Sequence, residues 1–358
     1  MSSKRCSRPS KVAVLTTQTS VPTRRGSGFW IAVGGALVVV VALAILSLFV
    51  GTRGLEPEAV IAVLSGGGSP EAQAIVLGQR LPRTLIGLVG GAALALAGAV
   101  IQAHTRNPLA DPGLLGVTAG SSLAAVFAIS VLGLTTPVGY LWFAFAGAAA
   151  GTALVSFIGI VAGRRRDASP AALVLAGAAV SAFLSAVTGI ILLLDSAALD
   201  VFRFWTVGSL AGGRGLDVLL PVLPFLVVGA VLALGHSRAL DTLALGDDLA
   251  RSLGRRLLPT RLLGLTIVTL LVGGATAILG SLGFIGLVAP HAVRWFTGPG
   301  HRLLLPMSAL AGAAITVTGD MLGRVIVSPS ELPVGVILGV VGGPAFLLII
   351  ARMRSSTR

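Results

Sequence analysis

The chain has 358 residues, of which 55% are hydrophobic and only 11% are charged, whereas soluble domains carry about 25% charged residues. Its net charge of +13 does not favour nucleic-acid binding, because the basic residues lie mostly between apolar runs and fit a topological role instead. The only cysteine, Cys6, excludes an intramolecular disulfide bond and a cysteine-ligated metal cluster. We therefore predict an all-α, polytopic membrane protein.

Apolar runs of about 20 residues, the length that a helix needs to cross the hydrocarbon layer, recur along the chain. They follow a tail, residues 1–28, that contains six lysines and arginines and no acid. The first run is too long for a signal-peptide core and lacks a cleavage site. We predict about ten spanning helices within a membrane domain at residues 29–354. Their predicted ranges are 29–50, 81–103, 114–133, 139–163, 171–194, 217–236, 260–280, 282–297, 302–323 and 332–351.

The charges of the loops predict the orientation, because arginine and lysine are retained on the cytoplasmic side of a membrane. We assign the arginine-rich loops to the cytoplasm, which places both termini there and requires an even number of crossings. For this reason the short range 282–297 is counted as a crossing, or as a broken helix in the same role. The cytoplasmic set contains Arg164, Arg165, Arg166, Arg238, Arg251, Arg255, Arg256, Arg261, Arg294, Arg302, Arg352, Arg354 and Arg358, and the opposite set contains Glu56, Glu58, Glu71, Asp195, Asp200 and Glu331.

Two segments rich in glycine and proline, 107–113 and 283–290, do not fit a plain helix bundle. Irregular backbone at membrane depth is tolerated only where it is buried in protein or lines a cavity. In secondary transporters such interruptions in both halves point to the transport pathway. By analogy both segments are pathway candidates, although a simple cytoplasmic turn is an equal alternative for 107–113.

The predicted cytoplasmic loop 237–259 is the most informative polar stretch. Asp247 and Asp248 stand where a helix begins, a position at which the helix dipole favours carboxylates. Leu249 and Leu253 are four residues apart and therefore share one helix face. We predict two short helices on the membrane surface, which either dock a cytoplasmic partner or lie on the membrane without one.

The sequence offers little for catalysis. Neither of its two lysines, Lys4 and Lys11, follows a glycine, so the chain lacks a phosphate-binding P-loop. The four histidines do not have the spacing of a metal site. Asp320 and Arg324 are four residues apart near the outer end of a span, where they could pair, but no series of carboxylates and histidines forms a proton relay. We expect no catalytic residue and no bound cofactor or metal, and we consider ion-coupled transport disfavoured.

Several motifs occur together in one order along the chain. They are Arg80-Leu-Pro-Arg83-Thr, Gly98-Ala-Val-Ile-Gln102, Asn107-Pro-Leu-Ala-Asp-Pro-Gly-Leu-Leu-Gly-Val117, Trp205-Thr-Val-Gly-Ser-Leu210, Leu245-Gly-Asp-Asp-Leu-Ala-Arg-Ser-Leu-Gly254, Gly283-Phe-Ile-Gly-Leu-Val-Ala-Pro-His-Ala-Val-Arg294, Gly319-Asp-Met-Leu-Gly-Arg324 and Glu331-Leu-Pro-Val-Gly-Val336. Over about residues 30–351 the chain thus resembles the permease subunits of iron-siderophore and vitamin B12 ABC importers, the FecCD/BtuC-like family.

The resemblance implies a ten-helix subunit in the bacterial cytoplasmic membrane that forms a homodimer or a heterodimer around a central pathway. It implies two cytoplasmic ATPase subunits, which bind ATP-Mg, and an extracytoplasmic substrate-binding protein. The loop 239–254 matches the coupling helices that contact the ATPase. Its residues Leu245, Gly246, Asp247, Asp248, Leu249, Arg251, Leu253 and Gly254 are the implied coupling set.

The resemblance also assigns roles outside this loop. Arg80, Arg83 and Arg324 would pair with carboxylates of the binding protein, although Arg83 or Arg324 could instead satisfy an internal acid such as Asp320. Asn107, Pro108 and Leu109 would belong to the cytoplasmic gate, beside Ser169. Trp205, in the segment 203–212, would lie along the pathway.

The leading hypothesis is a permease for ferric siderophore, and cobalamin or haem is the alternative substrate in the same family. Two hypotheses from other classes remain, an ion-coupled secondary transporter and a structural or receptor membrane protein without flux. Co-purification of an ATPase with the chain would argue against both.

Overall fold

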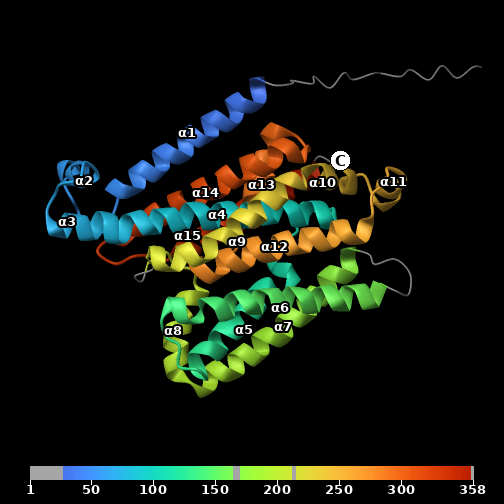
Figure 1. The fold of residues 1–358 in the computed structure, drawn as a ribbon, viewed down its shortest axis with the longest axis horizontal. Helices are drawn as coiled ribbons and strands as arrows, with labels where there is room; N and C mark the ends of the chain where they lie inside the picture. Colours follow the sequence, from blue (N-terminus) through green and yellow to red (C-terminus); the bar gives the residue numbers. More distant parts are fainter. Residues whose placement is uncertain (1–26, 164–169, 212–214, 356–358) are drawn as a thin grey trace, which may run out of the picture.

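The computed structural model describes residues 27–163, 170–211 and 215–355, and over these residues the chain is helical without a β-strand (Figure 1). Each of the ten predicted ranges coincides with a helix. These helices are α1 (Ser27–Phe49), α4 (Leu81–Thr105), α5 (Val117–Ser130), α6 (Pro137–Gly163), α7 (Pro170–Leu194), α9 (Leu216–Gly235), α12 (Leu257–Leu279), α13 (Ile285–Thr297), α14 (His301–Ile326) and α15 (Val334–Ser355). Within the described ranges, seven helices are long and apolar enough to span a bilayer, whereas α5, α13 and α15 fall below that criterion.

Shorter helices lie at the two ends of the bundle. One end carries α2 (Pro57–Leu64), α3 (Pro70–Ile75) and α8 (Ser196–Thr206), and we call it the α2 end. The opposite end carries α10 (Ser237–Ala244) and α11 (Asp247–Ser252), and we call it the α10 end. Helix α1 begins and α15 ends toward the α10 end (Figure 1), as an even number of crossings requires.

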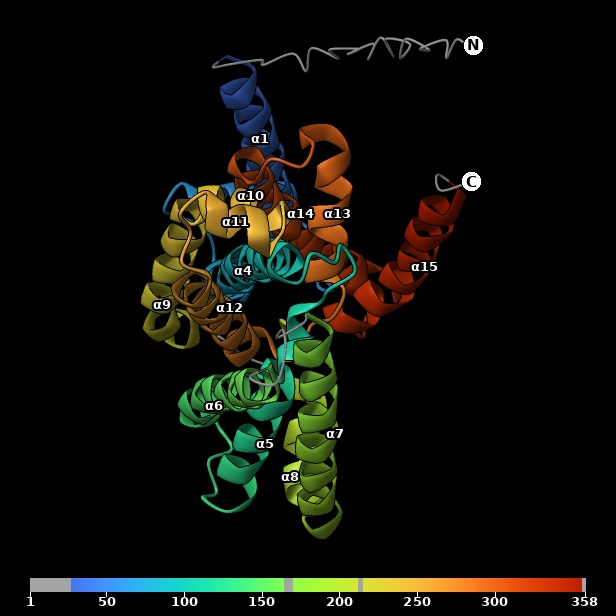
Figure 2. The same cartoon turned by 90° about the vertical axis from the view of Figure 1, so that its right-hand side faces the viewer.

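Helix α4 is the centre of the larger part of the bundle. Figure 2, which looks along this helix, shows α9, α12, α13 and α14 around it, while α5, α6, α7 and α8 form a second group. The apolar window that contains α4 is 78% buried, whereas that of α1 is only 17% buried. Helix α1 therefore presents most of its apolar surface outward, as expected of a helix that borders lipid.

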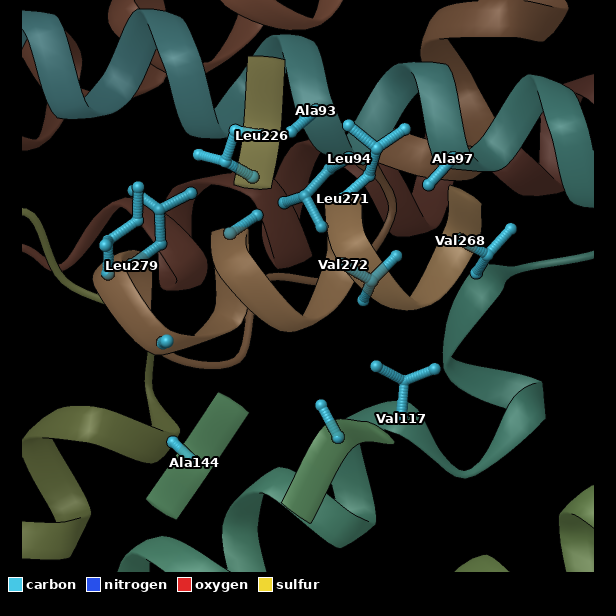
Figure 3. Close-up of a cluster of buried hydrophobic side chains, with 14 of the residues drawn as sticks. Ala93, Leu94, Ala97, Val117, Ala144, Leu226, Val268, Leu271, Val272 and Leu279 are labelled. Carbon is cyan, nitrogen blue, oxygen red and sulfur yellow. The ribbon is translucent and has the colours of Figure 1, made fainter. Parts of the chain in front are cut away.

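Helix α12 joins the two groups through a core of small and branched apolar side chains (Figure 3). Leu271 and Leu279 are buried on the side toward α4 and α9, near Leu94 and Leu226. Val272 points toward the second group, where Val117 is also buried. Because these contacting side chains are apolar, the group around α4 and the group of α5 to α8 pack against each other through α12 as one apolar unit.

Glycines allow the helices of the α4 group to approach closely, because they have no side chain to separate the backbones. A Cβ atom on Gly91 would overlap α14 at Gly312 and Thr316, and one on Gly98 would overlap the carbonyl group of Gly286 in α13. The same holds in the second group, where Gly147 and Gly151 face Gly120 and Gly116 of the α5 region. By contrast, Gly339 and Gly343 of α15 meet no atom within 4 Å.

We expect the Gly98→Ala variant to lose about 1–3 kcal/mol of stability, the usual effect of forcing extra atoms into a packed core. The added methyl group would collide with backbone of α13 rather than with a movable side chain. Gly35→Ala is the matched control, because nothing lies within 4 Å of that position in α1. Thermal unfolding of the purified protein in detergent would measure both; equal midpoints would show that the α4–α13 contact is looser than described.

The range 282–297 contains irregular backbone followed by a helix of 13 residues, which agrees with the predicted broken helix rather than with an unbroken one; that it crosses the membrane stays a prediction. Residues 280–284 are not helical, and α13 starts only after Phe284, whose φ of 67° is left-handed. Of this irregular stretch Gly280 is buried, whereas Gly283 is exposed and the other residues are half-buried. Ser281 N–H donates to the Trp205 carbonyl at 3.3 Å, and a Cβ on Gly280 would overlap the same carbonyl. Contact with the end of α8 therefore shields the first part of this non-helical backbone, as irregular backbone inside a membrane requires.

Candidate functional site

The three predicted docking arginines lie together at the α2 end, and two of them are buried. Arg80 is 5% exposed and ends a π-helical turn, Val76–Arg80, that leads into α4. Its guanidinium donates to the carbonyl oxygens of Leu48 (2.8 Å), Phe49 (3.0 Å) and Arg53 (2.7 Å). The last carbonyl groups of a helix have no hydrogen-bond partner within it. Arg80 therefore supplies hydrogen bonds to carbonyl oxygens at the C-terminal end of α1.

Arg324 binds the same end of α1. It is 2% exposed and donates from Nη1 to the carbonyl oxygens of Ser47 and Val50, both at 3.0 Å. Its Nη2 forms an ion pair with Asp320, one turn earlier in α14. The predicted pairing of Asp320 with Arg324 is confirmed, and it neutralises a guanidinium that would otherwise be buried without a counter-ion.

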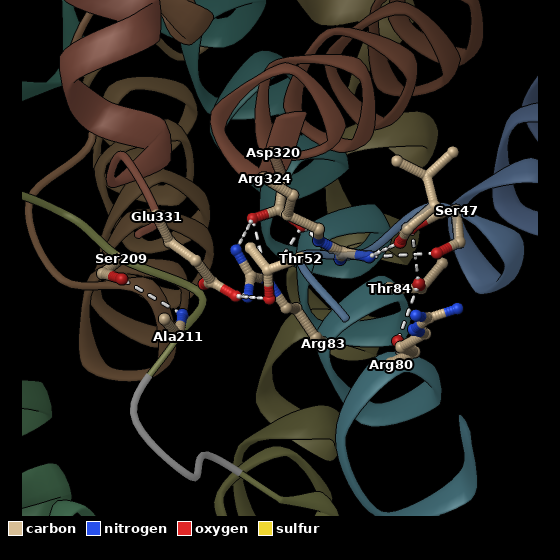
Figure 4. Close-up of polar contacts among 11 residues, drawn as sticks. Ser47, Thr52, Arg80, Arg83, Thr84, Ser209, Ala211, Asp320, Arg324 and Glu331 are labelled. Atoms are coloured by element: carbon tan, nitrogen blue, oxygen red, sulfur yellow. Dashed lines mark hydrogen bonds and ion pairs between the residues drawn. The ribbon is translucent and has the colours of Figure 1, made fainter. Parts of the chain in front are cut away.

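Arg83 bridges a buried acid and a more accessible one (Figure 4). Its Nε lies 2.9 Å and its Nη2 2.7 Å from Asp320 Oδ1, while its Nη1 lies 2.6 Å from Glu331 Oε2. The Asp320 side chain is 2% exposed, against 30% for Glu331. The internal alternative therefore holds for both Arg83 and Arg324, and a partner could contact Arg80 or Arg324 directly only by displacing their present bonds.

A cavity of about 130 Å³ opens at this cluster. Four arginines and one acid contribute to its wall, so its charge is positive. Arg324 Nε lies buried there without a hydrogen-bond partner among the described residues. The lining residues are Gly51, Thr52, Arg53, Ile75, Gln79, Arg80, Arg83, Arg324 and Glu331.

The predicted coupling segment forms the two short helices α10 and α11 at the α10 end. Gly246 and Gly254 bracket α11 with φ of 105° and 79°, a conformation that favours glycine. Leu245, Leu249 and Leu253 are 58%, 55% and 61% exposed. Leu249 and Leu253 are four residues apart and share one face of α11, and Leu245, which caps the end of α10, adds a third exposed leucine across Gly246. We call these three residues the leucine strip.

The two neighbouring aspartates of α11 differ in environment. The side chain of Asp248 is 99% exposed and pairs, among the described residues, with Arg251 on the same helix at 3.2 Å. Asp247 instead faces the bundle, where its carboxylate lies 2.7 Å from Arg261 of α12 and 3.6 Å from Arg106 at the end of α4. Asp247 therefore fixes the position of α11, whereas Asp248 and Arg251 belong to the outer face with the leucine strip.

Helix α10 is fixed at a separate point. Asp241 accepts from the backbone N–H of His301 at 2.9 Å, and its Oδ1 lies 2.7 Å from Nδ1 of the same histidine. His301 is the first residue of α14. The coupling segment is thus attached by carboxylates to α4, α12 and α14.

The predicted gate residues form a turn next to this segment. Asn107 follows α4, and its side-chain oxygen accepts from the Leu109 N–H at 2.9 Å across Pro108. The turn ends at Asp111, which accepts from the Gly113 N–H at 2.8 Å, and burial raises the pKa of this carboxyl group. Ser169 and the arginines 164–166 lie outside the described residues.

Trp205 lies in the interior rather than on an open surface. It is 1% exposed and its ring stacks on Phe202, with 5.4 Å between the ring centroids. The neighbouring Phe204 is 61% exposed, and Arg203 lies 5.0 Å from its ring centroid. Within a single chain Trp205 thus holds the end of α8 against residues 280–281, and its predicted place along the pathway stays a prediction.

Comparison with known proteins places this geometry in a family. The model of the FecCD transport family matches residues 38–352. The chain belongs to the FecCD transport family. Among its FecCD relatives, the ferric enterobactin transport system permease protein of Escherichia coli (strain K12) is 45% identical over 323 residues, which cover 90% of this chain and 95% of that protein. The Fe(3+)-citrate import system permease protein of Bacillus subtilis (strain 168) is 43% identical over 80% of this chain and 84% of that protein.

A solved inward-facing structure of a metal-chelate-type ABC transporter has the same fold as this FecCD chain. It aligns with a TM-score of 0.78 and 29% identity, and the alignment covers 90% of this chain and 99% of the other.

Three residues of these FecCD clusters were not singled out as site residues from the sequence. Glu331 stands in a recognised motif, but only the fold brings it to Arg83. Arg106 directly precedes the predicted gate, and Asp241 lies within the loop 239–254 but outside the residues assigned to coupling. Each could have been suspected from its place beside a motif, whereas its partner is remote in the sequence.

Proposed function

We propose that this chain is the permease subunit of an ABC importer that carries a ferric siderophore across the bacterial cytoplasmic membrane. The observation that carries the proposal is the leucine strip on α10 and α11. A strip of half-exposed leucines on a polar segment at one end of a membrane bundle is suited to bind a soluble partner, and membership of the FecCD family supports an ATPase as that partner.

In this proposal the α10 end and both termini face the cytoplasm, and the α2 end faces outward. Two ATPase subunits bind ATP-Mg and contact α11, and the contact moves the gate at Asn107–Leu109. A second permease subunit, identical or related, completes the pathway. Exposed apolar faces on α7, such as Leu193 at 87%, and on α15, such as Val340 at 69%, are available to that subunit or to lipid.

The substrate assignment rests on relatives named for iron chelates. It is tested by uptake of labelled ferric siderophore, cobalamin and haem in iron-starved cells with and without this gene. We expect only ferric siderophore uptake to fall when the gene is removed. If only cobalamin or haem uptake falls, the permease function is supported but the substrate assignment is wrong.

An ion-coupled transporter of the same fold class would not need the leucine strip. Purification of the tagged chain from the native membrane distinguishes the two classes. An ATPase that co-purifies and supports ATP-dependent uptake in proteoliposomes supports the importer. Uptake that follows an ion gradient without an ATPase would overturn it.

At the α2 end, Arg83 is the proposed contact for a carboxylate of the binding protein, with Arg80 and Arg324 holding the cluster in place. We expect Arg83→Gln to weaken docking several-fold and to reduce its dependence on salt, because charge pairs of this kind steer association. We expect Glu331→Gln to strengthen docking, since it removes the negative charge that pairs with Arg83 Nη1.

Binding of the purified substrate-binding protein to the permease in nanodiscs, at low and high salt, measures both effects. Glu58→Gln is the control, because this exposed acid lies at the same end on α2 and takes no part in the cluster. If folded Arg83→Gln protein binds with the affinity and salt dependence of the native chain, Arg83 is not the docking residue.

A further inference from the structure

Asp247 joins three parts of the molecule that are separate in the sequence. It begins α11, and its two carboxylate oxygens face different arginines: Oδ2 lies 2.7 Å from Arg261, and Oδ1 lies 3.6 Å from Arg106. The side chain is only 25% exposed. Each arginine therefore has its own oxygen, and the carboxylate can hold one while it releases the other.

The bond to Arg261 positions α11 on α12. Its short distance and hydrogen-bonded geometry make it the stronger of the two contacts. Both partners are about three-quarters buried, which reduces the screening that weakens surface pairs. Loss of this bond should loosen α11 itself.

The contact with Arg106 reaches the gate instead. Arg106 ends α4 in a left-handed conformation, with φ 51°, and the next residue is Asn107. Since a non-glycine residue rarely adopts this conformation without support, the backbone at Arg106 is held by its surroundings. Its N–H donates to Ala103 O at 3.3 Å and that of Asn107 donates to Gln102 O at 3.1 Å.

At 3.6 Å the Arg106–Asp247 contact is an ion pair without a hydrogen bond. Attraction between charges falls slowly with distance, so such an ion pair remains attractive over a range of geometries. It can therefore persist while α11 shifts, and it can be broken at little cost. An ion pair of this kind is suited to link α11 and the end of α4 if they move relative to each other.

We propose that Asp247 is a positioning residue that transmits motion of α11 to the gate turn Asn107–Leu109 through Arg106, while Arg261 keeps α11 seated. The proposal rests on the proposed function, since it needs an ATPase that moves α11. When the ATPase displaces α11, the ion pair with Asp247 moves Arg106, and the start of the gate turn moves with it. Asp248, which points away from the bundle, has no part in this link.

The test compares Arg106→Gln with Arg261→Gln in proteoliposomes that contain the complete transporter. All variants carry Cys6→Ser, which removes the only cysteine, and Leu109→Cys with a spin label that reports on the gate. Arg302→Gln is the matched control, because it removes an exposed arginine at the α10 end that forms no ion pair among the described residues. The measurements are ATPase affinity, uptake per ATP hydrolysed and the ATP-dependent change in the label spectrum.

We expect Arg106→Gln to leave ATPase affinity unchanged, to lower uptake per ATP about two- to fivefold and to reduce the response of the label. Arg261→Gln should weaken ATPase binding as well. Asp247→Asn should show the effects of Arg106→Gln and Arg261→Gln together, because Asp247 contacts both arginines.

The proposal is overturned if Arg106→Gln matches Arg302→Gln in uptake per ATP and label response. It is also overturned if Arg106→Gln lowers ATPase affinity as much as uptake, which would indicate a structural role alone. Failure of the native chain to bind any ATPase would contradict the proposed function, and the proposed role of Asp247 would then also be rejected.

Discussion

Replacing Asp320 by asparagine is expected to lower the free energy of unfolding by about 3–5 kcal/mol, the usual result of removing one partner from a buried ion pair. Asp320 is 1% exposed and accepts from both Arg83 and Arg324. Without its charge, two guanidinium groups face each other across an uncharged amide. Arg83 would retain Glu331, but Arg324 would retain only carbonyl oxygens of α1.

The control for this prediction is Asp200→Asn in α8. Asp200 also pairs with an arginine, Arg203, at 3.2 Å, but both side chains are at least 60% exposed. Exposed pairs of this kind contribute about 1 kcal/mol or less. Chemical unfolding in detergent measures both variants. If Asp320→Asn and Asp200→Asn have equal free energies of unfolding, the charge of Asp320 does not stabilise the arginine cluster.

The second large effect is expected at the leucine strip. Changing Leu249 and Leu253 together to aspartate should reduce binding of the ATPase by about 100-fold or more, and uptake should fall to background. Burying a leucine at an interface contributes about 1.5–3 kcal/mol, and two such losses correspond to at least that factor. The folded chain should tolerate the change, because both side chains are more than half exposed.

Leu64→Asp provides the matched control, because Leu64 is 48% exposed on α2 at the opposite end of the bundle. Co-purification of the ATPase with each variant, together with a thermal midpoint, separates assembly from folding. If the double variant retains the ATPase at native affinity, the strip faces lipid and the coupling assignment is wrong.

The helical elements were predictable because bilayer thickness sets a minimum length for apolar runs, and all ten ranges coincide with helices. The two short helices of the loop 237–259 also follow from local signals, since Gly246 and Gly254 bracket α11 and glycine disfavours a helix interior. The short α13 was predictable only as an alternative, because Gly283 and Pro290 mark an interruption without fixing where the helix resumes.

The polar clusters were less predictable, because pairing between remote residues is decided by packing. Asp320 and Arg324 are one helical turn apart, so their pair could be read from spacing alone. The contact of Arg83 with Asp320 joins residues 237 positions apart, and no local pattern encodes it. For the same reason the sequence treats Asp247 and Asp248 alike, although one faces the bundle and the other faces away.

The capping of α1 by two arginines has a consequence for biosynthesis. Arg80 is made soon after α1, but Arg324 binds Ser47 from 277 residues further along the chain. Until α14 is in the membrane, half of this cap is missing and α1 has little other protein contact to hold it. Attachment of the first helix therefore awaits nearly the last, so that a nascent chain truncated before α14 would expose an incompletely bonded helix end to membrane quality control.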